Sequence, residues 1–583
     1  MYDVIVIGAG WCGLVAAKTY LQACPDAQVL IVDGDSSIGG TWSKERLYPH
    51  LVAEAHHGLF EFSDLPMSGN SVLPDGRIPS AAVHAYLVEY ATKYNLIERI
   101  RLNTWIENVR REPRALADDN SLHWTLTAAG SQEQLQTKKI IITTGLTSEP
   151  FIPSLPGREE FEGEVLHSKA LGHPRTVGRI SEPSVRHVVV YGGSKSAFDA
   201  VYLLLRAGKT VDWVIREEGG GPSMMTPLSI LGQPSFRLNN SRILPLFSPH
   251  PFGPPGELSW WQRVVHHRSG RWAQFIVIMF WRAMAYLLQR PWGYDTSPNG
   301  QRLKPLLGLD SLFWSPATLG VMTHPELWDE IHSGQRVKIH REAITGLGRD
   351  KRVILSSGRE LSSADLVVCA TGWHARHSFF APEDQLALGL PSTASFDPES
   401  QQRWIDLQRT ADREITEELP ILQMNPVPPP PLRCEDDHHL YRFIAPSREV
   451  SSHERSIAFV GFLRTAGAPI VYEAQALWAT AYLTGALEVP EAPQREREIA
   501  RTNAWIRHRY LCGRKVPFAL FDFLPYVDML YRDLEINSHR KPNPIAEICG
   551  LYRPQDFRGV VSEWLANQRA KDMKGVENVV DKS

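Results

Sequence analysis

Short apolar runs alternate with longer amphipathic segments over the first two thirds of this chain. The runs are rich in valine and isoleucine and end at glycine or polar residues, as expected of strands buried on both faces. They occur at Asp3–Ile7, Val29–Val32, Lys138–Ile142, His187–Tyr191, Val211–Ile215 and Asp365–Cys369. Helical periodicity follows two of them, at Leu14–Ala23 and Phe198–Ala207. Because strands and helices alternate, the pattern predicts an α/β fold with parallel sheets.

The first strand–helix junction carries a glycine turn typical of dinucleotide-binding proteins. Gly8, Gly10 and Gly13 form a G-x-G-x-x-G motif directly after the first strand. Gly8 permits a tight turn, Gly10 lets the backbone approach a pyrophosphate, and Gly13 lets the helix pack close to the strands. Asp33 ends the next strand, where a carboxylate accepts the hydroxyls of an adenosine ribose. An acid there favours FAD or NAD over the 2′-phosphorylated NADP.

Two more glycine-containing segments are expected beside this turn. A Gly-Gly pair followed by threonine and tryptophan leaves backbone room for a cofactor, and the indole can pack on a flat ring system. The strand that ends at Ile142 continues into a Thr-Thr-Gly sequence, whose glycine also permits close approach. The residues assigned to the first site on this basis are Gly40, Thr41, Trp42, Thr144 and Gly145.

The same order of strand, glycine turn, helix and strand recurs after residue 186. The second turn begins at Gly192, and Ser194 stands where the motif has its second glycine, which weakens the pattern but keeps the side chain small. The later strand Asp365–Cys369 also ends in Thr-Gly. The residues assigned to this second site are Gly192, Ser194, Lys195, Ser196, Arg216, Thr371 and Gly372. The repeat indicates an internal duplication of a nucleotide-binding unit.

The charges at the ribose ends of the two copies are opposite. The first copy ends its second strand in Asp33, whereas the second ends in Arg216 and carries Lys195 in its turn. A cation at that position suits a ribose 2′-phosphate, so the second site is predicted to prefer NADPH. Arg216 could also be an ordinary surface charge, and only the glycine turn before it favours the phosphate role.

The chain of 583 residues is too long for one typical domain. We expect a first part of an FAD-binding domain at 1–160, an NADPH-binding domain at 161–372, and a return to the first domain with a helical region at 373–583. A stretch at 219–323, rich in proline, glycine and tryptophan, is predicted to be a helical insertion that forms lids or substrate walls. A proline-started helix at Ile470–Leu483 could direct its N-terminus at a flavin.

Composition excludes several classes of partner. The net charge of −3 offers no overall attraction to nucleic acid. The six cysteines contain no C-x-x-C pair, which argues against a dithiol reductase and for a reducing compartment. Because the first strand begins at residue 3, we expect no cleavable signal peptide and a cytoplasmic protein. Composition and motifs leave the oligomeric state open.

The most membrane-like segment is Trp272–Leu288. It is shorter than the ~20 residues that a membrane span needs, and Arg282 interrupts it. A buried helix is the favoured interpretation. The wall of an apolar substrate channel and a contact with one face of a membrane are the alternatives.

Taken together, these motifs resemble the flavin-containing monooxygenases and the related Baeyer–Villiger monooxygenases, from about Tyr2 to Gly485. Gly8-Ala-Gly-Trp-Cys-Gly13, Phe62-Ser-Asp-Leu-Pro66, Phe161-x-Gly163-x-x-x-His167 and the two Thr-Gly strand ends add to the likeness. The resemblance is strongest to fungal enzymes of secondary metabolism. It implies that NADPH reduces FAD, and that the reduced flavin takes up O2 as a C4a-(hydro)peroxide. One oxygen atom then enters a small lipophilic substrate by hydroxylation, epoxidation or Baeyer–Villiger oxidation.

Carrying the family's site residues over adds four positions. Asp64 and Val109 join the predicted cofactor site. Glu54 falls where many members place an asparagine beside the flavin, with His56 close by, and both are candidate catalytic residues. Glu54 could equally be a solvated loop acid. Leu171 occupies the position of an aromatic residue that separates the subclasses, so the type of oxygenation is left open.

Two other functions remain open. A flavin-dependent oxidase or desaturase would use O2 only to reoxidise the flavin, and a non-catalytic flavin-binding protein would be consistent with the weakened turn at Ser194. No metal site is expected. The pairs His266–His267 and His438–His439 are interpreted as solvated loop histidines, since adjacent side chains diverge.

Overall fold

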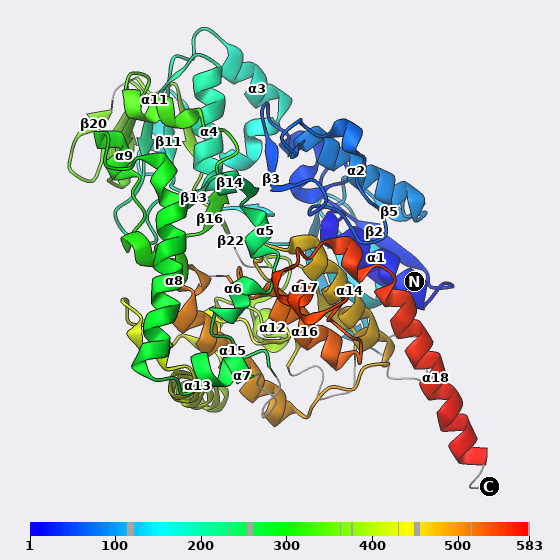
Figure 1. The fold of residues 1–583 in the computed structure, drawn as a ribbon. Coiled ribbons are helices and arrows are strands. Elements are labelled where there is room, and N and C mark those ends of the chain that lie inside the picture. The colour runs from blue at the N-terminus through cyan, green and yellow to red at the C-terminus, as the bar shows by residue number, and fades with distance from the viewer. Residues whose placement is uncertain are drawn as a thin grey trace.

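The structure is a computed structural model with two large sheets, each combined with helices (Figure 1). The first sheet is mixed, because β6–β7 and β7–β8 pair antiparallel, and the second sheet is parallel throughout. It describes residues 1–113, 122–230, 232–253, 260–361, 363–374, 377–429, 431–447, 455–514 and 516–580. The predicted α/β class, with two nucleotide-binding units and a largely helical insertion, is confirmed.

The first sheet is built around β1, which lies between β2 and β8 and is parallel to both. The sheet has the order β5-β2-β1-β8-β7-β6, with β25 also parallel to β8. Alternate side chains of β1 enter different cores: Val4 and Val6 pack with α1 and α14, and Ile5 and Ile7 pack on the other face. Burial on both faces explains the continuous apolar run. The bounds are β1 Tyr2–Ile7, β2 Val29–Val32, β5 Ile100–Arg101, β6 Ile106–Pro113, β7 Leu122–Ala128, β8 Gln134–Ile142, β25 Ile457–Phe459 and α1 Trp11–Ala23.

The second sheet repeats the architecture with five parallel strands in the order β10-β21-β11-β12-β17. Its central strand again divides its side chains between two cores. An antiparallel meander of β18, β19 and β20 lies beyond it. The bounds are β10 Glu164–His167, β11 His187–Tyr191, α4 Lys195–Arg206, β12 Thr210–Val214, β17 Val337–His340, β18 Ile344–Gly348, β19 Arg352–Leu355, β20 Glu360–Leu361 and β21 Leu366–Cys369.

The chain crosses between the two sheets twice, and the crossings lie side by side. β9 (Glu149–Pro150) leads toward the second unit and pairs antiparallel with β22 (Trp373–His374), which leads back. β9 and β22 thus form a two-stranded link between the nucleotide-binding units.

The insertion at 219–323 packs against the C-terminal helices, as the green and orange elements of Figure 1 show. Trp281 of α8 lies 4.8 Å from Phe521 between ring centroids, and Arg242 pairs with Asp528 at 2.5 Å. The elements of the insertion are β13 Met224–Thr226, β14 Ser229–Ile230, β15 Gln233–Pro234, α5 Phe236–Asn239, α6 Ile243–Leu246, α7 Trp260–Val265, α8 Arg271–Gln289, α9 Pro298–Arg302, α10 Ser311–Trp314 and β16 Leu319–Val321.

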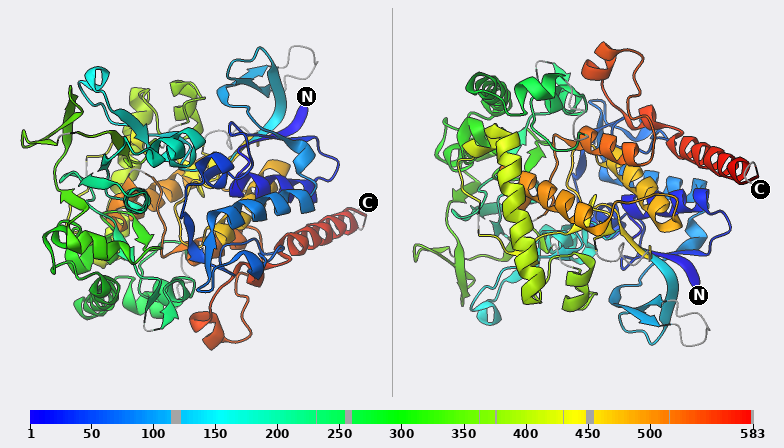
Figure 2. Two further views of the ribbon diagram at one scale, coloured as in Figure 1. Left: turned by 90° about the horizontal axis from the view of Figure 1, so that it is seen from above. Right: turned by 90° about the horizontal axis from the view of Figure 1, so that it is seen from below.

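The C-terminal region is mostly helical, as predicted, and α14 packs on α1 of the first unit. The last helix, α18, projects from the body of the molecule (Figures 1 and 2). The remaining elements are β3 Val52–His56, β4 Arg77–Pro79, α2 Ser80–Lys93, α3 Pro174–Ser181, α11 Leu327–Ser333, α12 Pro382–Leu388, α13 Pro398–Glu418, β23 Leu440–Tyr441, β24 Ala445–Pro446, α14 Ala468–Thr484, α15 Ala492–Arg509, α16 Phe523–Asp533, α17 Pro544–Cys549 and α18 Val560–Val580.

The interpretation of Trp272–Leu288 as a buried helix is wrong for one of its faces. The segment forms α8, whose inner face is buried at positions such as Val277 and Trp281, while Phe275 on the outer face is 64% exposed. Periodicity gave the helix, but a helix that is apolar on all sides does not reveal which face is covered. Within the described ranges, every helix is too short or too polar to cross a membrane.

Candidate functional site

The first glycine turn packs against the end of β8 so closely that two of its glycines are required. A Cβ on Gly13 would lie 1.8 Å from the carbonyl oxygen of Gly8. A Cβ on Gly8, whose φ is +117°, would lie 2.8 Å from the carbonyl oxygen of Thr143. Thr143 in turn donates its hydroxyl to the carbonyl of Ile7 at 2.8 Å. Contacts within the protein, without any ligand, therefore hold the conformation of this turn.

Gly10 differs from the other two glycines. Its φ is −87°, and among the described residues the nearest atom to an added Cβ is Cα of Gly40 at 3.5 Å, an ordinary contact. The packing of the protein thus does not demand glycine here. In a dinucleotide turn this position faces the pyrophosphate, and a Cβ would occupy that approach. Gly10 is also the N-cap of α1 without a side-chain cap, so the first N–H groups of the helix remain available to an anion.

Asp33 lies at the end of β2 and is half-buried. Its carboxylate accepts hydrogen bonds from the backbone N–H groups of Ala9 at 2.6 Å and Asp35 at 2.9 Å. Burial raises the pKa of Asp33, and the two N–H groups act in the opposite direction. The bond to Ala9 holds the carboxylate against the glycine turn. Each carboxylate oxygen has a further lone pair for a ribose hydroxyl.

The other segments assigned to the first site come together beside this turn. The N–H of Gly39 donates to the carbonyl of Ala9 at 3.0 Å, which places Gly40 against Gly10. Thr41 and Thr147 are joined through their hydroxyl oxygens at 2.9 Å, so the loop that contains Thr144 and Gly145 meets the Gly-Gly loop. Trp42 is partly exposed and packs edge-on against Phe60.

The start of α14 also reaches the first turn. Gly461, with φ +91°, lies so close to Cys12 that its Cβ would be 2.4 Å from the cysteine sulfur. Cys12 also bonds to Tyr472 in the first turn of α14. The predicted helix at Ile470–Leu483 is therefore α14, and its N-terminus lies beside the glycine turn, where a helix dipole favours negative charge.

The second turn is as tightly fixed as the first. A Cβ on Gly192, whose φ is +138°, would lie 2.1 Å from the carbonyl oxygen of Ala370. Ser194 is the N-cap of α4, but its side chain makes no capping hydrogen bond, and Ser196 follows in the first turn of the helix. The open N-terminus of α4 is suited to an anion. Thr371 donates its hydroxyl to Phe151, and the carbonyl of Gly372 accepts a bond from His167 at 2.9 Å, both on the link between the units.

The two cations of the second site have different environments. Arg216 is exposed beyond the end of β12, with its guanidinium over the backbone of Gly219. The ammonium of Lys195 pairs with Asp199 and lies 3.2 Å from the hydroxyl of Thr323. Lys195 therefore points toward an internal carboxylate, and Arg216 is the better placed of the two for a ribose phosphate. That Lys195 contributes to the phosphate site stays a prediction.

The second turn faces the first unit. Tyr48, six residues after Trp42, donates its hydroxyl to Asp199 of α4 at 3.1 Å. Nearby, the N–H of Val321 in the insertion donates to Glu54 of β3 at 3.1 Å. Neither Tyr48 nor Asp199 was identified as a site residue from the sequence, because nothing in a sequence shows that positions 151 residues apart are bonded.

Glu54 lies in this region between the two units. It belongs to β3 rather than to a loop, but its side chain is exposed, so the alternative interpretation as a solvated loop acid is wrong about the loop and confirmed for the solvation. Desolvation by the surrounding protein raises the pKa of Glu54, while the charges of Lys195 and Arg464 and the N–H of Val321 oppose the shift. Arg464, at the start of the loop before α14, is a second residue that the motifs did not identify.

His56 is two residues further along β3, beside β4. Burial lowers the pKa of its imidazole, and the charge of Asp75 acts against that shift. Asp75 itself pairs with Arg77 at 2.6 Å. His56 therefore lies next to the β3–β4 turn, whereas Glu54 is bonded to the insertion.

Two residues carried over by resemblance have partners within the protein. Val109 is 1% exposed in the core and donates its N–H to the carbonyl of Phe379 at 2.8 Å. The carboxylate of Asp64 pairs with Lys18 of α1 at 2.5 Å. Their assignment to the cofactor site stays a prediction.

The histidine pairs are also corrected. His266, His438 and His439 are buried, and burial lowers the pKa of both His266 and His438 to about 4. The sequence around these histidines predicts loops, and it does not show that distant segments cover them. In the described part of the chain, His, Cys, Asp and Glu side chains do not gather in threes as metal ligands, and all six cysteines are free thiols.

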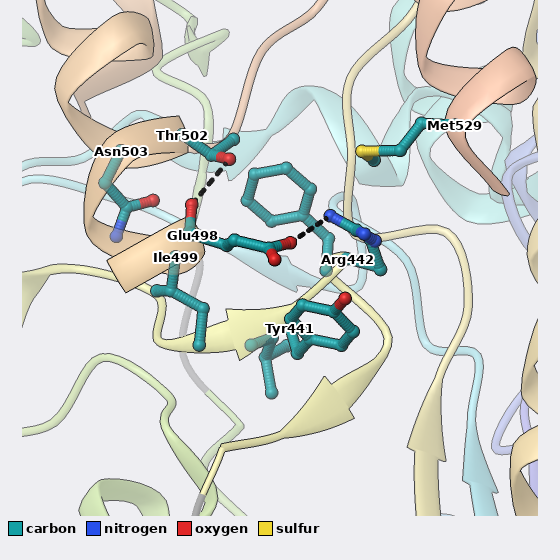
Figure 3. Close-up of a pocket in the computed structure, with 9 residues that line it drawn as sticks. Tyr441, Arg442, Glu498, Ile499, Thr502, Asn503 and Met529 are labelled. Carbon is teal, nitrogen blue, oxygen red and sulfur yellow. Dashed lines mark hydrogen bonds and ion pairs between the residues drawn. The ribbon is translucent and has the colours of Figure 1, made fainter. Parts of the chain in front are cut away.

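A small hollow elsewhere on the surface is a structural feature and contains none of the predicted site residues (Figure 3). It lies among β23, α15 and α16. Arg442 enters it and pairs with Glu498 at 2.9 Å and with Asp533 at 2.8 Å. Because Arg442 and its ion pairs fill the hollow, we assign it no ligand.

Comparisons with known proteins agree with this geometry. A family profile described as pyridine nucleotide-disulphide oxidoreductase matches residues 5–232, which include both glycine turns. FAD-dependent monooxygenase resA of Aspergillus sclerotiorum is 88% identical over 99% of this chain and 100% of its own length. FAD-dependent monooxygenase rstn6 of Aspergillus nomiae is 79% identical over 99% and 100%. The structure of cyclohexanone monooxygenase from Rhodococcus sp. Phi1 bound to NADP+ has a similar fold, with 16% identity, a TM-score of 0.56, and coverage of 92% of this chain and 97% of that chain.

Proposed function

The chain belongs to the family of FAD-dependent monooxygenases, and on this premise we propose that NADPH binds at its second glycine turn and that the enzyme oxygenates a small lipophilic molecule. FAD is assigned to the first turn. The observation that carries the proposal is the contact between Tyr48 and Asp199 at 3.1 Å. It brings α4, the helix after the second glycine turn, against the segment that contains Tyr48 in the first unit. NADPH bound at the second turn would therefore face FAD bound at the first turn.

The residues of the first site fit an adenine dinucleotide. Gly10 leaves room where the backbone must approach a pyrophosphate, and the uncapped start of α1 provides N–H groups for its oxygens. Asp33 is held by Ala9 in position for the ribose hydroxyls. When bound, FAD supplies the electron transfer and the activation of O2. The start of α14 stabilises negative charge beside it.

The second site separates NADPH from NADH by charge. Arg216 is exposed at the end of β12 and pairs with a 2′-phosphate. The uncapped start of α4 binds the pyrophosphate. Lys195 and Asp199 form an internal ion pair that fixes α4 against Tyr48 and Thr323. These contacts keep the two turns facing each other.

Glu54 is proposed as the residue that holds a proton near the reacting atoms. Desolvation keeps it protonated to higher pH than an ordinary glutamate, and the bond from Val321 fixes its orientation. Its carboxyl oxygen that does not accept from Val321 is free to orient a substrate or donate a proton. His56 is proposed to support β3 from the β4 side.

The substrate is proposed to be a lipophilic intermediate of fungal secondary metabolism. The relatives come from Aspergillus species, and a distant structural neighbour is named for cyclohexanone, a small ketone. The insertion contributes β16, which carries Val321, so it forms one wall beside Glu54. The reaction is a hydroxylation, an epoxidation or a Baeyer–Villiger insertion.

The deciding experiment uses purified holoenzyme with NADPH, ¹⁸O2 and candidate metabolites extracted from a fungal strain in which the gene is deleted. One ¹⁸O atom in the product, with oxidation of one NADPH, is the expected result. Stoichiometric peroxide with no label in the product would identify an oxidase or desaturase. If NADPH fails to bleach the flavin under anaerobic conditions, the chain is a binding protein and the proposal fails.

A further inference from the structure

Helix α8 has an apolar face that the rest of the described chain leaves exposed. Its inner face packs into the core through residues such as Ala273, Val277 and Trp281. On the opposite face, Phe275 is 64% exposed, an unusual value for a large aromatic residue. The exposed side chains, here called the α8 stripe, are Trp272, Phe275, Ile276, Met279, Ala283 and Tyr286.

The stripe is continuous. At 3.6 residues per turn its members fall within an arc of ~100°, and at 1.5 Å per residue it extends ~21 Å along the helix. Trp260 of the neighbouring α7 is 69% exposed and adds a further indole near it. Figure 1 shows α8 running along the outer edge of the molecule. Scattered exposed apolar residues are ordinary, but a contiguous stripe marks an interaction surface.

The segment that carries the stripe is rich in arginine. Residues 258–294 contain five arginines and no aspartate or glutamate. Asp310, from outside the segment, pairs with Arg282 through two bonds of 2.7 and 2.8 Å. The exposed arginines of the segment that have no such pair among the described contacts are Arg263, Arg268, Arg271 and Arg290. These four arginines give the segment around the stripe an excess of positive charge.

We infer that the α8 stripe lies in the interface of an anionic lipid membrane, with α8 parallel to the bilayer plane. Aromatic and aliphatic side chains bordered by arginines are the composition of interfacial helices. A second copy of this chain is the less suitable occupant, because symmetric pairing would bring the arginine-rich surfaces together. The membrane contact goes beyond the oxygenation chemistry and does not depend on it.

The test is flotation of the FAD-loaded full chain with vesicles of phosphatidylcholine and phosphatidylserine. We expect the protein to float with these vesicles and to stay largely unbound with phosphatidylcholine alone. Phe275→Glu with Met279→Glu should lower the bound fraction by more than about tenfold, because charges enter the acyl boundary. Arg263→Gln and Arg271→Gln should each weaken binding about fivefold and reduce its dependence on salt.

The matched control is Ile545→Glu, since Ile545 is 77% exposed on α17, away from the stripe. It should float like the parent. Every variant must keep its flavin absorbance and thermal unfolding temperature, which separates loss of binding from loss of fold. The inference is overturned if the parent ignores anionic vesicles, if the Phe275→Glu, Met279→Glu protein floats normally, or if sedimentation shows that these changes convert a dimer into a monomer.

Discussion

The backbone N–H of Val321 donates a hydrogen bond to the carboxylate of Glu54, with the nitrogen and oxygen 3.1 Å apart. Val321 belongs to the last strand of the insertion, and Glu54 belongs to β3 of the first unit. The bond ties the insertion to the region between the two glycine turns. Desolvation at this position raises the pKa of Glu54, so the structure gives this carboxyl group both an orientation and an altered protonation.

Replacing Glu54 by glutamine should preserve the fold, because the amide oxygen still accepts from Val321. The ratio of product formed to NADPH consumed should fall about 10²-fold, the size of a general acid–base contribution. Because the pKa of Glu54 is raised, the parent should show a pH-dependent limb in kcat/KM that Glu54→Gln lacks. Steady-state rates across the pH range measure both effects. Glu89→Gln, on the exposed side of α2, is the control. Unchanged coupling and pH profile would exclude a role for the carboxyl group.

Gly10→Ala should lose FAD binding, whereas Gly13→Ala should lose stability of the fold. Alanine at Gly10 meets only Gly40 at 3.5 Å, so the apoprotein should fold with unfolding free energy changed by less than about 1 kcal/mol. FAD binding should be lost, since the methyl group blocks the approach of the pyrophosphate. Alanine at Gly13 would place Cβ 1.8 Å from Gly8 oxygen and should destabilise the apoprotein by more than about 3 kcal/mol. Urea unfolding and flavin titration distinguish the two. A yellow, tightly bound Gly10→Ala holoenzyme would contradict the assignment.

Arg216→Ala should raise the KM for NADPH by about 10–100-fold, which corresponds to the free energy of losing a charged hydrogen bond to phosphate. The KM for NADH should change little, because NADH lacks the 2′-phosphate. Initial rates of flavin reduction by each coenzyme provide the measurement. Arg206→Ala, also exposed but at the far end of α4, is the matched control. Equal losses with both coenzymes would mean that Arg216 does not read the phosphate.

Ionisation of Glu473 should lower the free energy of unfolding of the protein as pH rises. Glu473 is half-buried on α14 and accepts hydrogen bonds from Ser63, and desolvation followed by the charge of Asp64 raises its pKa to about 8. A carboxyl group with a raised folded-state pKa stabilises the fold fully below its unfolded pKa, and that contribution is lost as pH rises toward the folded value. The loss between roughly pH 4.5 and 8 is at most about 5 kcal/mol.

Glu473→Gln removes this ionisation while keeping an acceptor for Ser63. Its free energy of unfolding, measured by urea denaturation from roughly pH 5 to 9, should vary less with pH than that of the parent and exceed it at the alkaline end. The exposed Glu89→Gln protein should follow the parent. If the parent and Glu473→Gln curves stay parallel, Glu473 does not titrate in this range.

Much of the fold could be predicted because its signals are local. The runs at Val29–Val32 and His187–Tyr191 are the bounds of β2 and β11, since strands buried on both faces must be apolar throughout. The glycine turns were equally readable, because close packing of Gly8 and Gly192 against the ends of β8 and β21 excludes any side chain. The partners of Val109 and Asp64 could not be predicted, because a motif position does not show whether an N–H or a carboxylate is bonded to a distant segment.

Residues that are neighbours in the chain were enough to predict the two nucleotide-binding units, their order and the opposite charges of Asp33 and Arg216. The packed structure was needed to show that Tyr48 meets Asp199, that Glu54 is bonded to Val321, and which face of α8 stays exposed. These depend on contacts between distant segments. Local periodicity fixes which residues share a face of a helix or strand, but only the packed neighbours decide whether that face meets protein or solvent.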